Sequence, residues 1–169
     1  MKQSVKLIAG NWKMNGLGAS LGEAAALHAE VEAQAPACRV ALCPPATLID
    51  RMAAALRDSP VEVGGQDCRA ETAGAFTGDI SAEMLKDAGA TLVILGHSER
   101  RQGHGETDLL VSAKAEAALA AGLGPIICVG ETLAQREAGE AVEVVRGQVL
   151  NSLPLALAGR DFAVAYEPV

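Results

Sequence analysis

The sequence is poor in aromatic residues and has no excess of positive charge. Aromatic side chains make up 2% of its 169 residues, and 14 lysines and arginines face 21 acidic residues, giving a net charge of −7. Nucleic-acid-binding surfaces combine basic patches with aromatic side chains, so we expect no nucleic acid among its partners. A chain this acidic also offers no long-range attraction to anions. Binding one would need local groups, such as a lysine or a helix N-terminus.

Metal-binding cysteine spacing and long apolar runs are also absent. The four cysteines (Cys38, Cys43, Cys68 and Cys128) form no CxxC pair. We therefore expect reduced, mostly buried thiols and no metal site. No stretch reaches the roughly 18 apolar residues that a membrane span needs, and no secretory signal opens the chain. These absences predict a cytoplasmic protein with no membrane partner.

The composition that remains is that of a globular α/β protein. Half of the residues are apolar, and no linker or low-complexity segment divides the chain, so we expect residues 1–169 to form a single domain. Short apolar runs alternate with longer, alanine-rich segments. The runs predict strands at 5–9, 39–43, 61–64, 91–95, 125–129 and 162–166. The intervening segments predict helices at 17–34 and 47–57, a short helix capped by Ser81, and helices at 107–121 and 132–153, the last interrupted at Gly139.

This alternation predicts βαβ units around a parallel sheet. The runs are near-continuously apolar, as is typical of strands that are buried on both faces. Two architectures fit the pattern, a (β/α) barrel and an open doubly wound sheet, and periodicity does not choose between them. A long polar stretch, 64–79, follows the third strand. Loops of this length usually make contacts or serve function, although a floppy surface loop is the alternative.

Three polar segments directly follow expected strands and carry groups with useful chemistry. After the first strand, Lys13 can hold an anion and Asn11 can offer its amide to an oxygen. After the fourth, His97 stands near the start of a short helix whose positive end favours a neutral imidazole, and Glu99 could pair with Lys13. After the sixth, Glu167 could remove a proton next to a carbonyl if it is desolvated.

Each segment alone also fits a plain structural role: an exposed turn lysine, a capping serine beside an incidental histidine, or a strand-end glutamate facing water. Ligands in α/β folds, however, lie beyond the carboxyl ends of the strands, so the three segments should converge. A base, a neutral electrophile and a cation are together what an enediol-forming isomerisation needs. We read His28 and His104 as surface residues.

Segments 9–15 (AGNWKMN), 96–101 (GHSERR) and 165–169 (AYEPV) resemble the three signature segments of the triosephosphate isomerase family. Segments 105–108 and 128–132 also match, and the resemblance runs from about residue 5 to the end. It implies a (β/α)8 TIM barrel, of which this chain would supply roughly the first six strands and lack the last two βα units. Residues 102–104 (QGH) stand where the family usually has an aromatic pair, at an expected surface.

The resemblance implies interconversion of dihydroxyacetone phosphate and glyceraldehyde 3-phosphate through an enediolate, in glycolysis and gluconeogenesis and without a cofactor. Glu167 would be the base and His97 the electrophile. Lys13 would hold the substrate phosphate and stabilise the enediolate, Asn11 would contact a substrate oxygen, and Glu99 would orient Lys13. Cys128 would pack behind these groups. The neutral histidine belongs to what is known of the family and is not an independent prediction.

The resemblance also implies a homodimer. Residues 74–78 would form the tip of an intersubunit loop, with Phe76 and Thr77 at the interface and Thr77 reaching Asn11 and Lys13 of the partner subunit. The chain ends in the hinge of the family's lid loop, so we expect a complementary carboxyl-terminal polypeptide, a cut lid, or assembly with copies of itself. The alternative function is a non-catalytic assembly or interaction module. Another sugar-phosphate enzyme is a weaker alternative, because the motifs match as a set.

Overall fold

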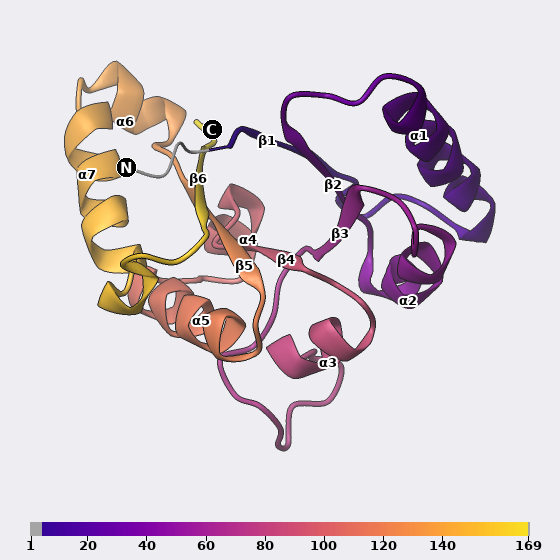
Figure 1. Cartoon of the computed structure of the whole chain (residues 1–169). Helices are drawn as coiled ribbons and strands as arrows, with labels where there is room; N and C mark the ends of the chain where they lie inside the picture. The colour runs from indigo at the N-terminus through magenta and orange to yellow at the C-terminus, as the bar shows by residue number, and fades with distance from the viewer. Residues whose placement is uncertain (1–4, 169) are drawn as a thin grey trace.

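Six parallel strands form one curved sheet with helices on its outer side, in a computed structural model that describes residues 5–168 (Figure 1). The strands are β1 (Leu7–Asn11), β2 (Arg39–Cys43), β3 (Val61–Gly65), β4 (Leu92–Leu95), β5 (Gly124–Val129) and β6 (Ala163–Tyr166). The helices are α1 (Leu21–Ala33), α2 (Ala46–Ala55), α3 (Ala82–Asp87), α4 (Ser98–Gly103), α5 (Asp108–Ala120), α6 (Leu133–Glu137) and α7 (Ala141–Ser152). Two 3-10 turns, η1 (Gly18–Ser20) and η2 (Leu155–Leu157), complete the set.

The order of the strands decides between the two architectures left open by the sequence. Each strand pairs in parallel with the next one along the chain, in the order β1-β2-β3-β4-β5-β6. A doubly wound sheet would reverse its order at a switch point, whereas a barrel proceeds in sequence. The sheet curves until the starts of β1 and β6 share one small hollow, lined by Leu7 and Ala163 among others. The six-stranded part of a TIM barrel is therefore confirmed.

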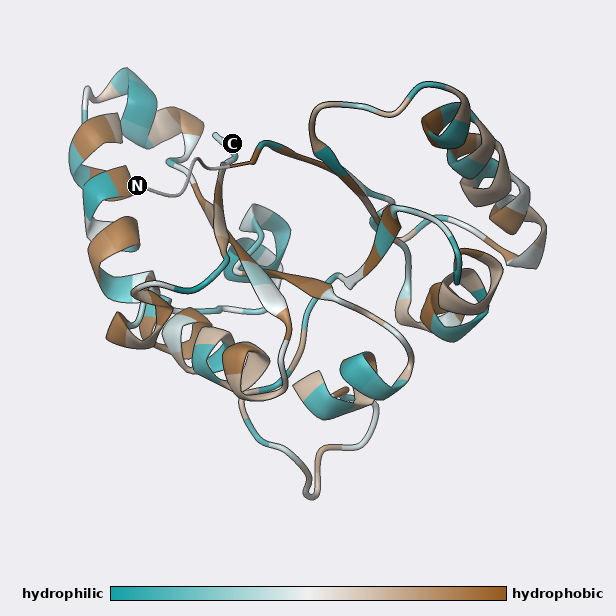
Figure 2. Ribbon diagram, viewed as in Figure 1, coloured by the Kyte–Doolittle hydropathy of each residue, from teal (hydrophilic) through white to brown (hydrophobic). Residues whose placement is uncertain are grey.

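Alternating side chains of the strands build two apolar clusters. One fills the barrel interior and comprises Ala41, Cys43, Leu92, Ile94, Ile126 and Cys128. The other lies between the strands and the helices and includes Val93, Leu95, Ile127, Ile49, Met52 and Val111. The strands are largely brown in Figure 2, while the surrounding helices mix brown and teal. This two-sided burial is the reason that the strand sequences read as continuous apolar runs.

The prediction of strands buried on both faces is right for β4 and β5 and wrong for β1 and β6. Every residue of β4 is buried, but Ile8 in β1 is 61% exposed and Val164 in β6 is 44% exposed. Among the described residues β1 and β6 each pair with one strand only, so less of their surface is covered. The first strand also begins at Leu7 rather than at Val5, which is exposed.

Most helix ends follow the sequence signals. Ser81 caps α3 by accepting a hydrogen bond from the Met84 N–H, and the predicted break at Gly139 separates α6 from α7. The single helix expected over 17–34 is instead η1 followed by α1. His28 is half-buried rather than exposed, whereas His104 is at the surface. No helix within residues 5–168 is long and apolar enough to cross a bilayer.

The polar loop between β3 and α3 projects away from the body of the protein (Figure 1). Within the loop, the Arg69 guanidinium lies 3.9 Å from the centre of the Phe76 ring. The same guanidinium pairs with Glu71 at 2.9 Å and with Asp79 at 2.8 Å. These contacts order the loop from within and count against a floppy loop. Thr77 stays exposed at the tip.

Candidate active site

The five residues singled out from the sequence gather at the carboxyl ends of the strands. Asn11 is the last residue of β1, His97 follows β4 after one glycine, and Glu167 directly follows β6. His97 Nε2 lies 3.2 Å from Glu167 Oε2, and Lys13 Nζ lies 2.7 Å from Glu99 Oε1. Parallel strands deliver their ends to one face, which explains why residues as far as 156 positions apart along the chain, Asn11 and Glu167, meet here.

His97 takes its position from a sharp turn at the end of β4. Gly96 has a φ of +66°, a value that L-residues with a Cβ rarely adopt, and the chain then enters α4. The cap of α4 is His97 itself and not Ser98, because His97 Nδ1 accepts a hydrogen bond from the Glu99 N–H at 3.2 Å. An imidazole that accepts at Nδ1 is neutral and carries its proton on Nε2, the atom that faces Glu167.

Glu167 is held by its backbone, and one of its two carboxylate oxygens is buried. Its N–H donates to the carbonyl of Val129 at 2.8 Å, continuing the β5–β6 ladder. Oε2 is buried and has no hydrogen-bond partner among residues 5–168, because the contact with His97 is close but poorly aligned. A carboxylate in this position can act as a general base on a C–H next to a carbonyl. Val169, the last residue of this sequence motif, lies outside the described residues.

Cys128 lies beside this carboxylate in the barrel interior and is 1% exposed. Burial, together with the nearby charge of Glu167, raises the pKa of the Cys128 thiol. The thiol therefore stays protonated and apolar in character next to the glutamate. The four cysteines are all free in the structure.

Lys13 has the only positive φ, +52°, among the non-glycine residues that the structure describes. Such a conformation costs roughly 1–3 kcal/mol and persists only when neighbours impose it. Here Asn11 Oδ1 accepts from the Lys13 N–H at 2.9 Å, and Gln66 Nε2 donates to the Lys13 carbonyl at 2.8 Å. Gln66 also donates to the Cys43 carbonyl at 2.9 Å, so it joins the ends of β1 and β2.

The charges of Lys13 and Glu99 stabilise each other. The hydrogen bond with Glu99 raises the pKa of Lys13, and the same bond lowers the pKa of Glu99. Both side chains are half exposed, so solvent screens much of this attraction. The pair nonetheless fixes the direction of the Lys13 ammonium toward α4.

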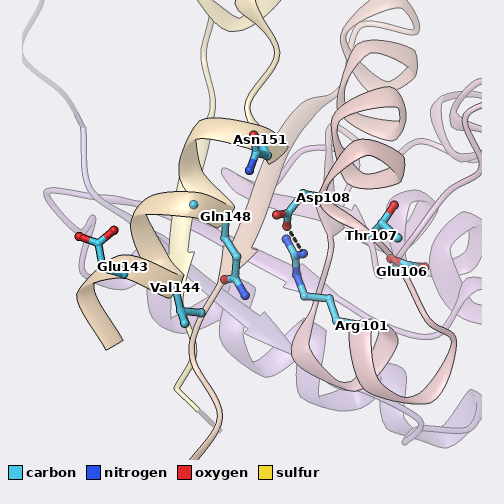
Figure 3. Close-up of a pocket in the computed structure, with 9 residues that line it drawn as sticks. Arg101, Glu106, Thr107, Asp108, Glu143, Val144, Gln148 and Asn151 are labelled. Atoms are coloured by element: carbon cyan, nitrogen blue, oxygen red, sulfur yellow. Dashed lines mark hydrogen bonds and ion pairs between the residues drawn. The ribbon is translucent and has the colours of Figure 1, made fainter. Parts of the chain in front are cut away.

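A cavity of about 290 Å³ opens around four of the five candidates, and Glu167 does not line it. Its lining comprises Asn11, Lys13, Met14, Gln66, Asp67, His97, Glu99, Arg100 and His104. It is of a size that suits a small, charged metabolite. Phe76 and Thr77 do not line it. A larger hollow, about 490 Å³, lies between the start of α5 and α7 and contains none of the five candidates (Figure 3).

A buried ion network supports the cavity from below. Lys114 and Glu106 have side chains 5% and 3% exposed and pair at 2.6 Å. Arg100 bridges Glu106 at 2.7 Å and Asp67 at 2.9 Å. Burial alone would raise the pKa of Glu106, but the hydrogen bonds from Lys114 and Arg100 lower it. Within residues 5–168, no cluster of three or more histidine, cysteine or acidic side chains could hold a metal ion.

The sequence did not single out Gln66, although it stands in the polar stretch directly after β3. Its position at a strand end was the available signal, because side chains there face the site. The ion network around Glu106 was harder to predict from the sequence. The segment 105–108 (GETD) contains Glu106, but no residue pattern in it indicates which side chains pair with it.

Comparisons with known proteins agree with this geometry. A family model described as triosephosphate isomerase matches residues 6–169. The sequence is 61% identical over 163 residues to the triosephosphate isomerase of Caulobacter vibrioides, covering 96% of this chain and 64% of that protein. It is also 61% identical to the enzyme of the same name from Afipia carboxidovorans, covering 96% of this chain and 65% of that protein.

The fold is similar to the crystal structure of triosephosphate isomerase from Bartonella henselae. The TM-score is 0.93 at 46% sequence identity, and the match covers 97% of this chain and 68% of that one. The chain thus spans 64–65% of the length of the two curated relatives described above.

Proposed function

The chain belongs to the triosephosphate isomerase family, and from this premise we propose that it interconverts dihydroxyacetone phosphate and glyceraldehyde 3-phosphate. The reaction proceeds by proton transfer through an enediolate. One observation carries the proposal, the 3.2 Å approach of His97 Nε2 to Glu167 Oε2 beside the Lys13 ammonium. It brings a carboxylate with one buried oxygen and a neutral N–H donor together, the pair that enolisation requires.

In the proposed mechanism, Glu167 removes a proton from the carbon next to the carbonyl. Oε2, which has no hydrogen-bond partner among residues 5–168, is the atom that would accept it. His97 donates its Nε2 proton toward the carbonyl oxygen and moves a proton between the two oxygens of the enediolate. Because Nδ1 is engaged with the Glu99 N–H, the imidazole does this as a neutral acid.

Lys13 and Asn11 supply charge and orientation. The ammonium of Lys13 offsets the negative charge of the phosphate and of the enediolate, and Glu99 orients it. Asn11 commits its Oδ1 to the Lys13 N–H, which leaves its amide N–H₂ for a substrate oxygen. The chemistry needs no metal or organic cofactor.

The remaining expectations belong to the same proposal. Residues 1–169 act as one domain in a cytoplasmic enzyme of glycolysis and gluconeogenesis. The enzyme works as a homodimer, with Phe76 and Thr77 at the interface. The ordered, projecting loop that carries these two residues supports this assembly. A complementary carboxyl-terminal polypeptide stays a prediction.

The test is an isomerase assay with glyceraldehyde 3-phosphate, comparing the unmodified chain with Glu167→Asp. Shortening the base by one methylene should lower kcat by roughly 100-fold or more. Glu137→Asp, on the exposed surface of α6, is the matched control and should retain full activity. An inactive unmodified chain would favour the non-catalytic module instead.

A further inference from the structure

Both backbone groups of Gly130 are bound by one side chain from α7. Gln148 Oε1 accepts a hydrogen bond from the Gly130 N–H at 2.7 Å, and Gln148 Nε2 donates to the Gly130 carbonyl at 3.1 Å. A primary amide that accepts and donates in this way imitates the backbone of a neighbouring strand. Gln148 therefore extends the pairing of β5 by one residue beyond its end at Val129.

On its other side Gly130 packs against the backbone of Glu167. A Cβ at position 130 would overlap the carbonyl oxygen of Glu167 and lie 2.5 Å from its carbonyl carbon. It would also lie 3.0 Å from the nitrogen of Pro168. These nearest atoms are all backbone, which cannot rotate aside as a side chain can, so a shift of Gly130 toward them should displace the Glu167–Pro168 peptide.

Gln148 and Arg101 both line the hollow between the start of α5 and α7 (Figure 3). Gln148 extends into it from α7, near Arg101. Arg101 Nε donates to the Gly96 carbonyl at 2.8 Å, and Nη2 donates to the Cys128 carbonyl at 3.1 Å. Arg101 thus holds the backbone of Gly96, next to His97, and of Cys128, which lies beside Glu167.

We propose that Gln148 is a positioning residue for Glu167, acting through the Gly130 peptide that it binds at both ends. This inference rests on the proposed function, because it assigns Glu167 as the base. Gln148 lines none of the cavity around His97 and Lys13, so its effect on the reaction is indirect. Its substitution should change the alignment of the carboxylate and leave substrate binding nearly intact.

Glutamine is needed at this place for both halves of its amide. Methionine has the same length but leaves the N–H and the carbonyl of Gly130 unpaired. An ionised glutamate can accept from the N–H, but it cannot donate to the carbonyl and repels it. A protonated glutamic acid can do both, so Gln148→Glu should regain the complete contact as the pH falls.

The first experiment compares Gln148→Met with Asn151→Met, a substitution in the same helix and lining the same hollow. Asn151 is exposed and makes no side-chain hydrogen bond within the described part of the chain, so its variant should match the unmodified protein. Gln148→Met should lower kcat roughly 10-fold or more, with KM changed less than about twofold. An unchanged kcat, or an effect confined to KM, would overturn the proposal.

The second experiment follows Gln148→Glu from pH about 8 to about 5, expressing kcat relative to the unmodified protein at each pH. The ratio should rise toward low pH, where a glutamic acid facing a carbonyl oxygen gains its proton. The ratio for Gln148→Met should stay flat. A flat or falling ratio for Gln148→Glu would contradict the role assigned to the amide.

Hydrogen exchange distinguishes a failure of the proposed function from a failure of the positioning role of Gln148, because it requires no enzyme activity. The N–H of Glu167, bonded to the Val129 carbonyl, should exchange at least several-fold faster in Gln148→Met than in Asn151→Met. If the unmodified chain has no isomerase activity and this difference is present, the positioning holds and the activity assignment falls. Equal exchange in the two variants would overturn the positioning, whatever the activity.

Discussion

His97 Nδ1 accepts a hydrogen bond from the backbone N–H of Glu99, two residues ahead in α4. The imidazole is therefore the cap of its own helix, and its second nitrogen is left to face Glu167 at 3.2 Å. One backbone contact thus sets the tautomer, the ring orientation and the direction of the donor. The first turn of α4 also carries Glu99, which binds Lys13, so a single short helix orients two candidate groups.

Nitrogen-15 NMR of the histidine side chains can check this tautomer directly. We expect His97 to show an unprotonated Nδ1 and a protonated Nε2 at neutral pH, because a protonated Nδ1 could not accept from Glu99. His104, an exposed residue whose side chain caps no helix N-terminus within residues 5–168, serves as the comparison. A protonated Nδ1 on His97 would contradict the assigned role of neutral donor.

Removing the Lys13 charge should harm both binding and the chemical step. Lys13→Met is expected to lower kcat/KM by roughly 100-fold, the worth of one strong charge-assisted hydrogen bond. Glu99→Gln keeps a partner for Lys13 but weakens it, so its loss should be several-fold and smaller. Steady-state kinetics at low and moderate ionic strength measures both. A larger loss in Glu99→Gln than in Lys13→Met would be inconsistent with an orienting role for Glu99.

The buried Lys114–Glu106 pair should matter for stability more than for chemistry. Lys114→Met leaves the carboxylate of Glu106 buried with less compensation, and should destabilise the fold by roughly 3 kcal/mol. Urea unfolding monitored by circular dichroism gives the difference. The double variant Lys114→Met, Glu106→Leu should recover part of this loss. Full additivity of the two single losses would argue against coupling.

Lowering the pH should remove the contribution of Glu106 to the stability of this ion network. The pKa of Glu106 is lowered in the folded state, so its contribution to stability is complete above its ordinary pKa of 4.5. That contribution disappears as the pH falls through the lower folded value. The destabilisation caused by Glu106→Gln should therefore shrink as unfolding is measured at successively lower pH below about 4.5. A destabilisation by Glu106→Gln that increases as the pH falls would contradict a lowered pKa of Glu106 in the folded state.

The contact between Gly130 and Glu167 predicts a strong effect from one methyl group. Gly130→Ala forces the Glu167–Pro168 peptide away and should reduce kcat by roughly 100-fold. Gly147→Ala is the matched control, because a Cβ there meets no atom within 4 Å and lies in the middle of α7. This control should keep its activity and gain up to about 1 kcal/mol of stability. Comparable losses in both variants would contradict a specific contact.

The apolar runs were sufficient to place all six strands to within two residues, although the burial on both faces that they predict holds for β4 and β5 and not for β1 and β6. The runs could not reveal that β1 and β6 have one neighbour each, because exposure depends on partners and not on the strand's own residues. Strand order, which decides between a barrel and an open sheet, is likewise absent from local patterns.

The five candidate residues could be chosen from the sequence, because they occupy strand ends and belong to long motifs. Gln66 and Gln148 could not, since each acts on backbone atoms at a distance, 53 and 18 residues away along the chain. A glutamine side chain carries no local pattern that announces such a partner. The structural alternative of a capping serine beside an incidental histidine is wrong, because the turn at Gly96 makes His97 the cap of α4 and Ser98 its first residue.

Isomerisation of glyceraldehyde 3-phosphate in heavy water, followed by proton NMR, tests most directly whether Glu167 moves a carbon-bound proton here. A carboxylate that exchanges its proton with solvent should introduce deuterium at carbon in the dihydroxyacetone phosphate formed. We expect the unmodified chain to give this labelled product, and Glu167→Gln to give none above the buffer reaction. Equal labelling by the unmodified chain and by Glu167→Gln, or isomerisation without any deuterium at carbon, would contradict the assignment of Glu167 as the base.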